Sequence, residues 1–321
     1  GAGAMGSAFS VPSLERQHDV IIVGTHLQDA FIDEIKNNNN FHPGLKLYLS
    51  EKTNIVKYMN LSDEFKKKPD LIVLGVNSKG INWVVDQLSV FFNGSILPPI
   101  LMLTKGLGVY ENKYELLVDK LERLLISKGF KNTNISAVAG PCLANGLANK
   151  VHTSVIFANK NLETVEWLKD ILTTDYYHPS ISNDMIGVEV CAAIKNIFSM
   201  VIGFSKGLYN ETMEDKLKEN DYLNTVASLM SQSVYEMELF VDFLNGNKKT
   251  VYGLAGFGDL FVSAQGGRNS KMGAYMSKGY IYSEAKKSKM PTETIEGAEL
   301  VFEIGSNIKN DFNIKKMPLM V

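Results

Sequence analysis

The sequence predicts an α/β fold, with a doubly wound parallel sheet in its N-terminal part and an all-helical C-terminal part. Two observations carry this prediction. Short apolar runs alternate with helical stretches up to about residue 183, which is typical of parallel strands covered by helices on both faces. From about residue 184 the pattern becomes helical. We therefore expect two domains, residues 1–183 and residues 184–321.

In the first domain, apolar strands are expected to be separated by helical stretches. The expected elements are a helix over 6–17, strand 20–23, a polar helix to about 36, strand 71–76, a helix over 80–92, strand 99–106, a helix near 111–128, and strands 135–140 and 154–158. In such a fold, ligands bind outside the carboxyl ends of the strands. Residues that follow a strand are therefore the first candidates for a binding site.

The second domain is expected to form around one buried helix. Residues 184–204 (DMIGVEVCAAIKNIFSMVIGF) are apolar nearly all round a helix, which predicts burial. Glu189 and Lys195 interrupt this stretch and argue against a membrane span. Further on, a polar loop near 210–221 and glycine-rich breaks at 253–258 and 266–267 divide the helical pattern.

Composition excludes several classes of protein. The 321 residues carry a formal net charge of -2 and have a pI of about 6.3, so we expect neither a nucleic acid nor a membrane surface as partner. Two cysteines, Cys142 and Cys191, do not form a disulfide framework, which suits the reducing cytoplasm. The five histidines lack metal-ligand spacing, so no metal site is expected.

The chain opens with GAGAMG, in which Gly1, Gly3 and Gly6 fit the dinucleotide-binding pattern G-x-G-x-x-G. The first glycine permits a tight turn, the second lets a pyrophosphate approach the backbone, and the third permits close packing. An expression remnant is the alternative, but the helix and strand 20–23 follow at the spacing of a Rossmann fold. We therefore expect strand 20–23 to be the second of the sheet. The first strand is then expected to be missing from this sequence, which would be a fragment.

The residues after strand 20–23 bear on the choice of cofactor. This position meets the adenosine ribose in such folds, and an acidic residue there favours NAD. Here Gly24, Thr25 and His26 occupy it, and no carboxylate follows before Asp29. His26 could face a 2′-phosphate or lie on the surface as an ordinary histidine. The sequence thus leaves NAD and NADP both open.

Lys195 is the first candidate for chemistry. A lysine in a buried helix is costly unless it is paired, because burial disfavours its charge. One interpretation is a structural ion pair, for example with Glu189. The other is a lysine that moves a proton in catalysis.

Two further groups follow from their local surroundings. Asp259 begins a helical turn after a glycine-rich loop, and the sequence Gly266-Gly267-Arg268-Asn269 offers backbone amides, a guanidinium and a side-chain amide. An arginine fork suits phosphate, although a surface turn would also explain this sequence. Lys105 lies at the carboxyl end of an expected strand, which alone is weak evidence.

Taken together, these segments resemble a known family. GAGAMGSAFSVP, LTKG, AGP (139–141), DMIGVEVCAAIKN, GLAGFGDL, GGRN and IEG (295–297) occur in the order and at the spacing of the NAD(P)-dependent glycerol-3-phosphate dehydrogenases. The resemblance extends over essentially the whole chain. It implies an oxidoreductase that interconverts dihydroxyacetone phosphate and sn-glycerol 3-phosphate with NAD or NADP. It also implies a homodimer in the cytoplasm that serves glycerophospholipid metabolism.

The resemblance also implies roles for individual residues. Lys195 would act as acid and base on the C2 oxygen of the substrate, assisted by Lys105 and Asp259. The residues that would hold the substrate are Asn196, Ser263, Arg268 and Asn269. The residues that would bind the cofactor are Gly1, Gly3, Ala4, Met5, Gly6, Thr25 and Glu296.

Three departures from the family pattern are visible. The family usually reads G-P-x-x-A-x-E where this chain has GPCLANG, so Gly146 occupies the glutamate position. Ser263 stands near the place of a family threonine, and one or two further helices would be expected beyond residue 321.

Two alternatives remain open on the residues alone. One is a related two-domain 3-hydroxyacid or ketopantoate-type reductase, which would not explain the GGRN segment. The other is a catalytically inactive dinucleotide-binding protein, which the absent first strand and Gly146 favour. The presence of Lys105, Lys195, Asp259 and Arg268 opposes it.

Overall fold

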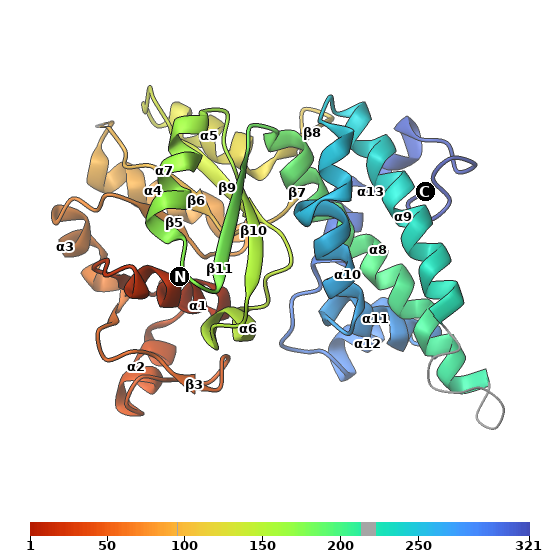
Figure 1. Ribbon diagram of the computed structural model, residues 1–321, viewed down its shortest axis with the longest axis horizontal. Helices are drawn as coiled ribbons and strands as arrows, with labels where there is room; N and C mark the ends of the chain where they lie inside the picture. Colours follow the sequence, from red (N-terminus) through yellow and green to blue (C-terminus); the bar gives the residue numbers. More distant parts are fainter. Residues whose placement is uncertain (95, 213–222) are drawn as a thin grey trace. The chain divides into compact units, whose positions relative to one another are not determined.

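The computed structural model describes residues 1–94, 96–212 and 223–321 (Figure 1). Contacts divide the chain into two compact units. Unit 1 comprises Gly1–Lys105 and Leu117–Met185, and unit 2 comprises Gly106–Leu116 and Ile186–Val321. The expected polar loop at 210–221 lies largely outside the described residues. The boundary at 183/184 stays a prediction, to which the structure adds that residues 106–116 belong to unit 2.

Unit 1 contains a five-stranded sheet in the order β11-β10-β9-β6-β5. The strands are β5 (Ile72–Leu74), β6 (Ile100–Met102), β9 (Ile135–Ala139), β10 (Thr153–Ala158) and β11 (Tyr177–Ser182). The prediction of parallel strands is confirmed for β5, β6 and β9, but β10 runs antiparallel to β9. Only the short helix α6 (Ala144–Ala148) lies between β9 and β10. A parallel crossover normally uses a longer helix, and its absence explains the reversal.

The expected strand at 20–23 pairs outside this sheet. It forms β1 (Ile21–Val23), which pairs in parallel with β4 (Asn54–Val56) in a separate two-stranded sheet. The hairpin of β2 (Phe41–His42) and β3 (Leu47–Tyr48) was also not predicted. Strands of two or three residues are too short to produce a readable alternation in sequence.

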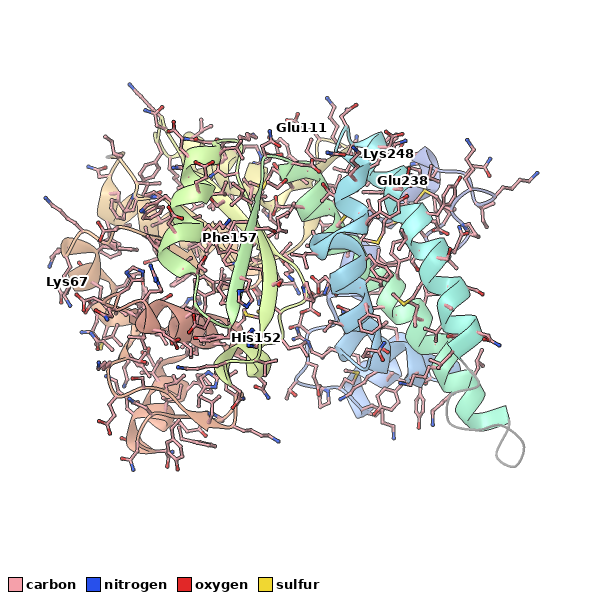
Figure 2. The ribbon with its side chains drawn as sticks, in the orientation of Figure 1. Lys67, Glu111, His152, Phe157, Glu238 and Lys248 are labelled. Carbon is pink, nitrogen blue, oxygen red and sulfur yellow. The ribbon has the colours of Figure 1, made fainter. Side chains whose placement is uncertain are left out.

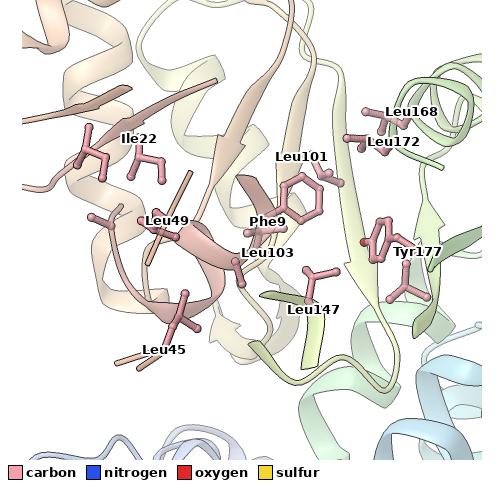
Figure 3. Close-up of a cluster of buried hydrophobic side chains, with 14 of the residues drawn as sticks. Phe9, Ile22, Leu45, Leu49, Leu101, Leu103, Leu147, Leu168, Leu172 and Tyr177 are labelled. Carbon is pink, nitrogen blue, oxygen red and sulfur yellow. The ribbon is translucent and has the colours of Figure 1, made fainter. Parts of the chain in front are cut away.

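Unit 1 contains a large cluster of buried apolar side chains (Figure 3). Phe9 of α1 packs edge-on against Tyr177 of β11, with ring centroids 6.1 Å apart. Ile22 of β1 and Leu101 of β6 join the same cluster. One cluster therefore connects the five-stranded sheet with the β1–β4 pair. The helices are α1 (Ala4–Glu15), α2 (Asp29–Asn37), α3 (Leu61–Lys66), α4 (Ile81–Phe92), α5 (Leu117–Ser127), α6 and α7 (Leu162–Leu172).

In the part of unit 2 that the structure describes, β7 (Leu107–Tyr110) and β8 (Lys113–Leu116) form a hairpin and the other regular elements are helices. The expected start of a helix at 111 is therefore wrong. Glu111 and Asn112 at the hairpin turn both have positive φ, 49° and 61°, as a tight two-residue hairpin turn requires. The helices are α8 (Met185–Thr212), α9 (Leu223–Phe243), α10 (Asp259–Ala264), α11 (Arg268–Ser277), α12 (Tyr282–Ser288) and α13 (Glu296–Asp311).

Helix α8 is the central element of unit 2. Its segment Met185–Leu208 is long and apolar enough to cross a membrane, but 83% of it is buried inside the structure. Ala192, Ala193 and Ile194 are at most 2% exposed, although successive residues of a helix point about 100° apart. The predicted burial of residues 184–204 is thus confirmed.

Helices α8 and α11 touch through their backbones. A Cβ on Gly203 would overlap the carbonyl of Ser270, and a Cβ on Gly273 would overlap that of Met200. Glycine is required at both positions because the overlapped atoms belong to main chain that cannot rotate away. Backbone contact therefore fixes how these two helices cross.

Helix α9 is held by polar contacts on two sides. Near its end, Lys248 contacts Glu238 at 3.7 Å and Asp242 at 3.4 Å (Figure 2). On its buried side, the carboxylate of Glu236 accepts hydrogen bonds from the backbone amides of Leu319 and Met320, both at 2.9 Å. Burial raises the pKa of Glu236 above its ordinary value. The chain near residue 320 is thus attached to the core of unit 2.

Candidate functional site

The glycine turn at residues 1–6 has the packing that the dinucleotide pattern requires. A Cβ on Gly6 would overlap the carbonyl oxygen of Gly1, and a Cβ on Gly1 would lie 2.6 Å from that of Gly75. A Cβ on Gly3 would meet nothing within 4 Å. The first and third glycines therefore permit close backbone packing, and the second borders open space. Such a turn fits the pyrophosphate of a dinucleotide.

Helix α1 begins directly at this turn. Gly3 is its N-cap residue, and the first helical hydrogen bond runs from the amide of Ser7 to the carbonyl of Gly3 at 2.9 Å. The amides of Ala4, Met5 and Gly6 precede that bond and have no acceptor within the helix. The first turn carries no acidic side chain. These amides, with the helix dipole, favour an anion at the turn.

Two side chains that the sequence analysis did not single out hold the peptide of Ala2. The amide of Ala2 donates to Gln28 Oε1 at 3.0 Å, and the same oxygen accepts from the amide of Thr25 at 3.0 Å. The carbonyl of Ala2 is bonded to Nε2 of His42 at 3.1 Å. Gln28 and His42 thus connect the glycine turn to the residues after β1 and β2.

The residues after β1 lie beside an aromatic cluster. The ring of His26 lies 5.2 Å from that of Trp83 and 6.3 Å from that of Tyr58. Tyr58 in turn donates a hydrogen bond to Gln87 Oε1 at 3.0 Å. Thr25 and His26 are thereby placed at the carboxyl end of β1, as predicted.

Lys105 follows β6 at the carboxyl end of that strand, as predicted. Its Nζ donates to the carbonyl of Gly140 at 3.4 Å, and Gly140 follows the next strand, β9. Thr104 donates to the carbonyl of Val76 at 2.6 Å, just beyond β5. Hydrogen bonds thus link the ends of three neighbouring parallel strands around this lysine.

Unit 2 brings Lys195, Asp259 and Ser263 together. Nζ of Lys195 donates to Asp259 Oδ1 at 2.7 Å and to Ser263 Oγ at 2.6 Å. Lys195 is 7% exposed and Asp259 is 3% exposed. The acid that the structure places against this buried lysine is Asp259, 64 residues further along the chain, whereas the sequence had suggested Glu189 as an example. A buried charge pair of this kind is a common arrangement in active sites.

Asn196, which follows Lys195 in α8, takes part in a chain of amide hydrogen bonds. Asn269 Nδ2 donates to Asn196 Oδ1 at 2.9 Å, and the amide of Gly297 donates to Asn269 Oδ1 at 2.8 Å. Both asparagine side chains are buried. A Cβ on Gly297 would lie 2.5 Å from the carbonyl of Asn196. Helices α8, α11 and α13 are thus joined at the residue that follows Lys195.

Arg268 and Glu296 form a more exposed ion pair on the same helices. Arg268 begins α11 and Glu296 begins α13, and their side chains are 53% and 34% exposed. A guanidinium with this exposure is accessible to an anion in solution.

The departure at Gly146 does not arise from the fold. Gly146 lies in α6, where a Cβ would make only ordinary contacts with Val151 at 3.9 Å and Leu143 at 4.0 Å. Helix α6 could therefore hold a larger residue at this position.

Comparison with known proteins shows the family to which this chain belongs. Residues 1–165 match the family model described as NAD-dependent glycerol-3-phosphate dehydrogenase N-terminus, and residues 184–321 match the one described as its C-terminus. The chain belongs to the NAD-dependent glycerol-3-phosphate dehydrogenase family. The resemblance inferred from the sequence is thereby confirmed.

Individual relatives cover nearly the whole chain. It is 27% identical to an NADP(+)-dependent glycerol-3-phosphate dehydrogenase of Archaeoglobus fulgidus over 316 residues, which are 97% of this chain and 90% of the relative. It is 26% identical to a glycerol-3-phosphate dehydrogenase [NAD(P)+] of Clostridium botulinum, over 96% of this chain and 87% of the relative.

Solved structures confirm the fold. A crystal structure of glycerol-3-phosphate dehydrogenase from Coxiella burnetii superposes with a TM-score of 0.80 at 24% identity, covering 100% of this chain and 90% of that one. The Saccharomyces cerevisiae enzyme gives a TM-score of 0.77 at 20% identity, covering 100% and 92%. The predicted combination of a Rossmann-type sheet and a helical C-terminal part is thus confirmed as the fold of this family.

Proposed function

We propose that this glycerol-3-phosphate dehydrogenase family member interconverts dihydroxyacetone phosphate and sn-glycerol 3-phosphate, using NAD or NADP. The observation that carries the proposal is the buried Lys195–Asp259–Ser263 group beside the exposed guanidinium of Arg268 in unit 2. A proton donor and an anion-binding group are the two functions that a phosphorylated ketone requires.

In this proposal Lys195 transfers the proton. An ammonium has three N–H donors, and two of them point at Asp259 and Ser263. These bonds fix the direction of the ammonium, so that a substrate oxygen at C2 accepts from Nζ. Lys195 polarises the carbonyl during reduction and gives it a proton. In the reverse direction it accepts the proton of the alcohol, with Lys105 and Asp259 assisting.

The substrate is held by groups of α8, α10 and α11. Arg268 would bind the phosphate, because a guanidinium fork matches phosphate oxygens. Ser263, Asn196 and Asn269 would orient the rest of the molecule, since their side chains are already fixed by hydrogen bonds. A bound phosphate would compete with Glu296 for Arg268.

Unit 1 would form the dinucleotide-binding domain and unit 2 the substrate domain. When bound, the nicotinamide of NAD(P)H supplies the hydride for ketone reduction. The chain's own contribution is to bind and orient the cofactor. The residues proposed for this are Gly1, Gly3, Ala4, Met5, Gly6, Thr25 and Glu296.

The direct test is the oxidation of NADH and NADPH with dihydroxyacetone phosphate as substrate. We expect turnover with the phosphorylated ketone and very little with unphosphorylated dihydroxyacetone, which lacks the group that Arg268 would bind. Equal rates with both ketones would contradict the proposal.

Replacing Arg268 with alanine should raise KM for dihydroxyacetone phosphate by roughly tenfold to a hundredfold, because a hydrogen bond to a charged group contributes about 1.5–3 kcal/mol. The binding of NAD(P)H should change much less. Steady-state kinetics with varied ketone measures this effect. Lys271→Ala removes an exposed cation from the same helix and is the matched control. If both variants keep the original KM, Arg268 is a surface residue only.

We also propose that the protein is a cytoplasmic homodimer in glycerophospholipid metabolism. Cys142 and Cys191 form no disulfide among the described residues, as suits a reducing compartment. Phe302 of unit 2 is 73% exposed, and a second copy could cover such an aromatic side chain. Sedimentation equilibrium would test the dimer. The product, sn-glycerol 3-phosphate, is the backbone on which glycerophospholipids are built.

A further inference from the structure

His42 is a buried histidine whose two ring nitrogens are both engaged. The residue is 1% exposed. Nδ1 lies 3.1 Å from the backbone nitrogen of Leu45, and Nε2 lies 3.1 Å from the carbonyl oxygen of Ala2. The edge of the ring of Phe31, on α2, packs against the imidazole with centroids 5.2 Å apart. The imidazole therefore connects the glycine turn to the loop after β2.

The partners of the ring determine its protonation state. The amide of Leu45 can only donate, so Nδ1 must accept and carries no proton. The carbonyl of Ala2 can only accept, so Nε2 must carry the proton and donate. These requirements are met by the neutral imidazole with its proton on Nε2. A protonated ring would direct an N–H at the amide of Leu45.

The peptide that His42 holds belongs to the proposed cofactor turn. Ala2 lies between Gly1 and Gly3, and its amide is held from the other side by Gln28 Oε1 at 3.0 Å. The hydroxyl of Ser7 also donates to the carbonyl of Ala2, at a longer 3.3 Å. The ring of His42 thus provides the shorter of the two hydrogen bonds that orient this carbonyl.

We propose that His42 is a positioning residue that holds the glycine turn in its binding conformation only while its ring is neutral, so that dinucleotide affinity falls in mildly acidic solution. The inference rests on the proposed function of the turn. It concerns control of that binding by pH, through a residue that does not itself touch the cofactor.

The electrostatic surroundings agree with this direction. Burial lowers the pKa of His42 below its ordinary value, and the backbone hydrogen bonds only partly oppose this. The charged side chains of the elements packed against the ring are Glu15 of α1, Lys46 beside Leu45, and Asp29, Asp33, Glu34 and Lys36 of α2.

The sign of the stability effect follows from the lowered pKa. The unfolded chain binds a proton at His42 near the ordinary value of about 6.5, whereas the folded chain binds it only at lower pH. Between these two values the unfolded state holds more protons. The contribution of His42 to stability is therefore complete above about pH 6.5 and is lost as the pH falls toward the folded-state pKa.

The variant His42→Gln tests the proposal, because its side-chain amide can still donate to Ala2 but does not titrate. NAD⁺ and NADP⁺ are suitable probes because both are stable in acid. We expect the wild type to lose affinity between pH 7.5 and 5.5 by about threefold or more beyond the loss in His42→Gln, the size of one ordinary hydrogen bond. Isothermal calorimetry at several pH values measures this difference.

Two comparisons separate His42 from other titrating groups. His178→Gln removes an exposed histidine from β11 and should keep the wild-type pH dependence. If the affinities for NAD⁺ and NADP⁺ fall equally as the pH is lowered, the 2′-phosphate of NADP⁺ is not the cause of the fall. A fall in affinity with pH that is as large in His42→Gln as in the wild type would overturn the proposal.

Nitrogen-15 NMR of the imidazole groups gives a readout that does not depend on the cofactor. We expect His42 to show the neutral tautomer with its proton on Nε2 at pH 7.5 and to become protonated only below the ordinary histidine value of about 6.5. Titration of His42 at or above that value would overturn the proposal. If the tautomer is as expected but neither dinucleotide binds at pH 7.5, the proposed function of the turn is wrong, and the proposed control of affinity is wrong with it.

Discussion

Replacing Lys195 with alanine should lower kcat for dihydroxyacetone phosphate reduction by roughly 10²–10⁴-fold, the range typical of a general acid or base. The affinity for NAD(P)H should stay nearly unchanged, because Lys195 lies in unit 2 and the glycine turn in unit 1. Stopped-flow kinetics with saturating ketone and a fluorescence titration of the cofactor measure the two quantities separately. Lys206→Ala, from the same helix, is the matched control.

The same substitution should also destabilise the protein, and this effect must be separated from catalysis. Asp259 is 3% exposed and would lose the cation that it contacts at 2.7 Å. Breaking a buried ion pair by removing one partner costs about 3–5 kcal/mol. The double variant Lys195→Met with Asp259→Leu removes both charges and should recover much of the stability, but not the turnover. Recovery of turnover in this variant would show that the pair is structural only.

The second large effect is expected in the glycine turn, where two chemically identical substitutions should have different consequences. Gly3→Ala places a methyl group in open space, so the protein should fold with nearly unchanged stability. The methyl group would occupy the side from which a pyrophosphate approaches the backbone. We expect a loss of NAD(P)H affinity of about a hundredfold, equivalent to about 2.7 kcal/mol. Calorimetric titration combined with a thermal melt measures both properties.

Gly6→Ala should instead lower the stability of the folded protein. Its methyl group would overlap the carbonyl oxygen of Gly1, which is main chain and cannot rotate away. Overpacking of a well-packed site costs about 1–3 kcal/mol or more. A lower melting temperature, accompanied by weaker cofactor binding, is the expected result. If Gly3→Ala melts earlier than Gly6→Ala, the roles assigned to these two glycines are wrong.

Features that depend on periodicity were predictable from the sequence. The apolar residues of 184–204 surround the helix on all sides, and burial is the only solution that satisfies them. The apolar runs near 72–74, 100–102 and 135–139 likewise become parallel strands. In each case one local pattern has a single stable interpretation.

Features that depend on pairing between distant segments were not predictable. The direction of β10 depends on the length of its connection from β9, which the apolar pattern of Thr153–Ala158 does not encode. The second strand of the hairpin at 107–116 runs directly into the amphipathic helix α5. The sequence pattern did not separate the two, so the predicted helix began too early, at 111. The positive φ of Glu111 and Asn112 decides the outcome, and neither residue is a glycine that would indicate it.

In the candidate site, too, residues with a local motif were predictable and contacts between distant residues were not. Motifs indicated Lys195, Asp259 and Arg268 individually, but the contact between Lys195 and Asp259 joins residues 64 positions apart. His42 and Gln28 have no motif of their own. Their importance arises from hydrogen bonds to Ala2, which only the folded chain reveals.

The glycine contacts between α8 and α11 have a consequence for which substrates can be accepted. Lys195 belongs to one of these helices and Arg268 to the other. Because the helices meet main chain against main chain at Gly203 and Gly273, a change of rotamer elsewhere cannot slide one along the other. The backbone positions that carry Lys195 and Arg268 are then held at one separation. Under the proposed function, we expect a ketone one carbon longer between its carbonyl and its phosphate to be reduced more slowly than dihydroxyacetone phosphate, although it carries the same chemical groups.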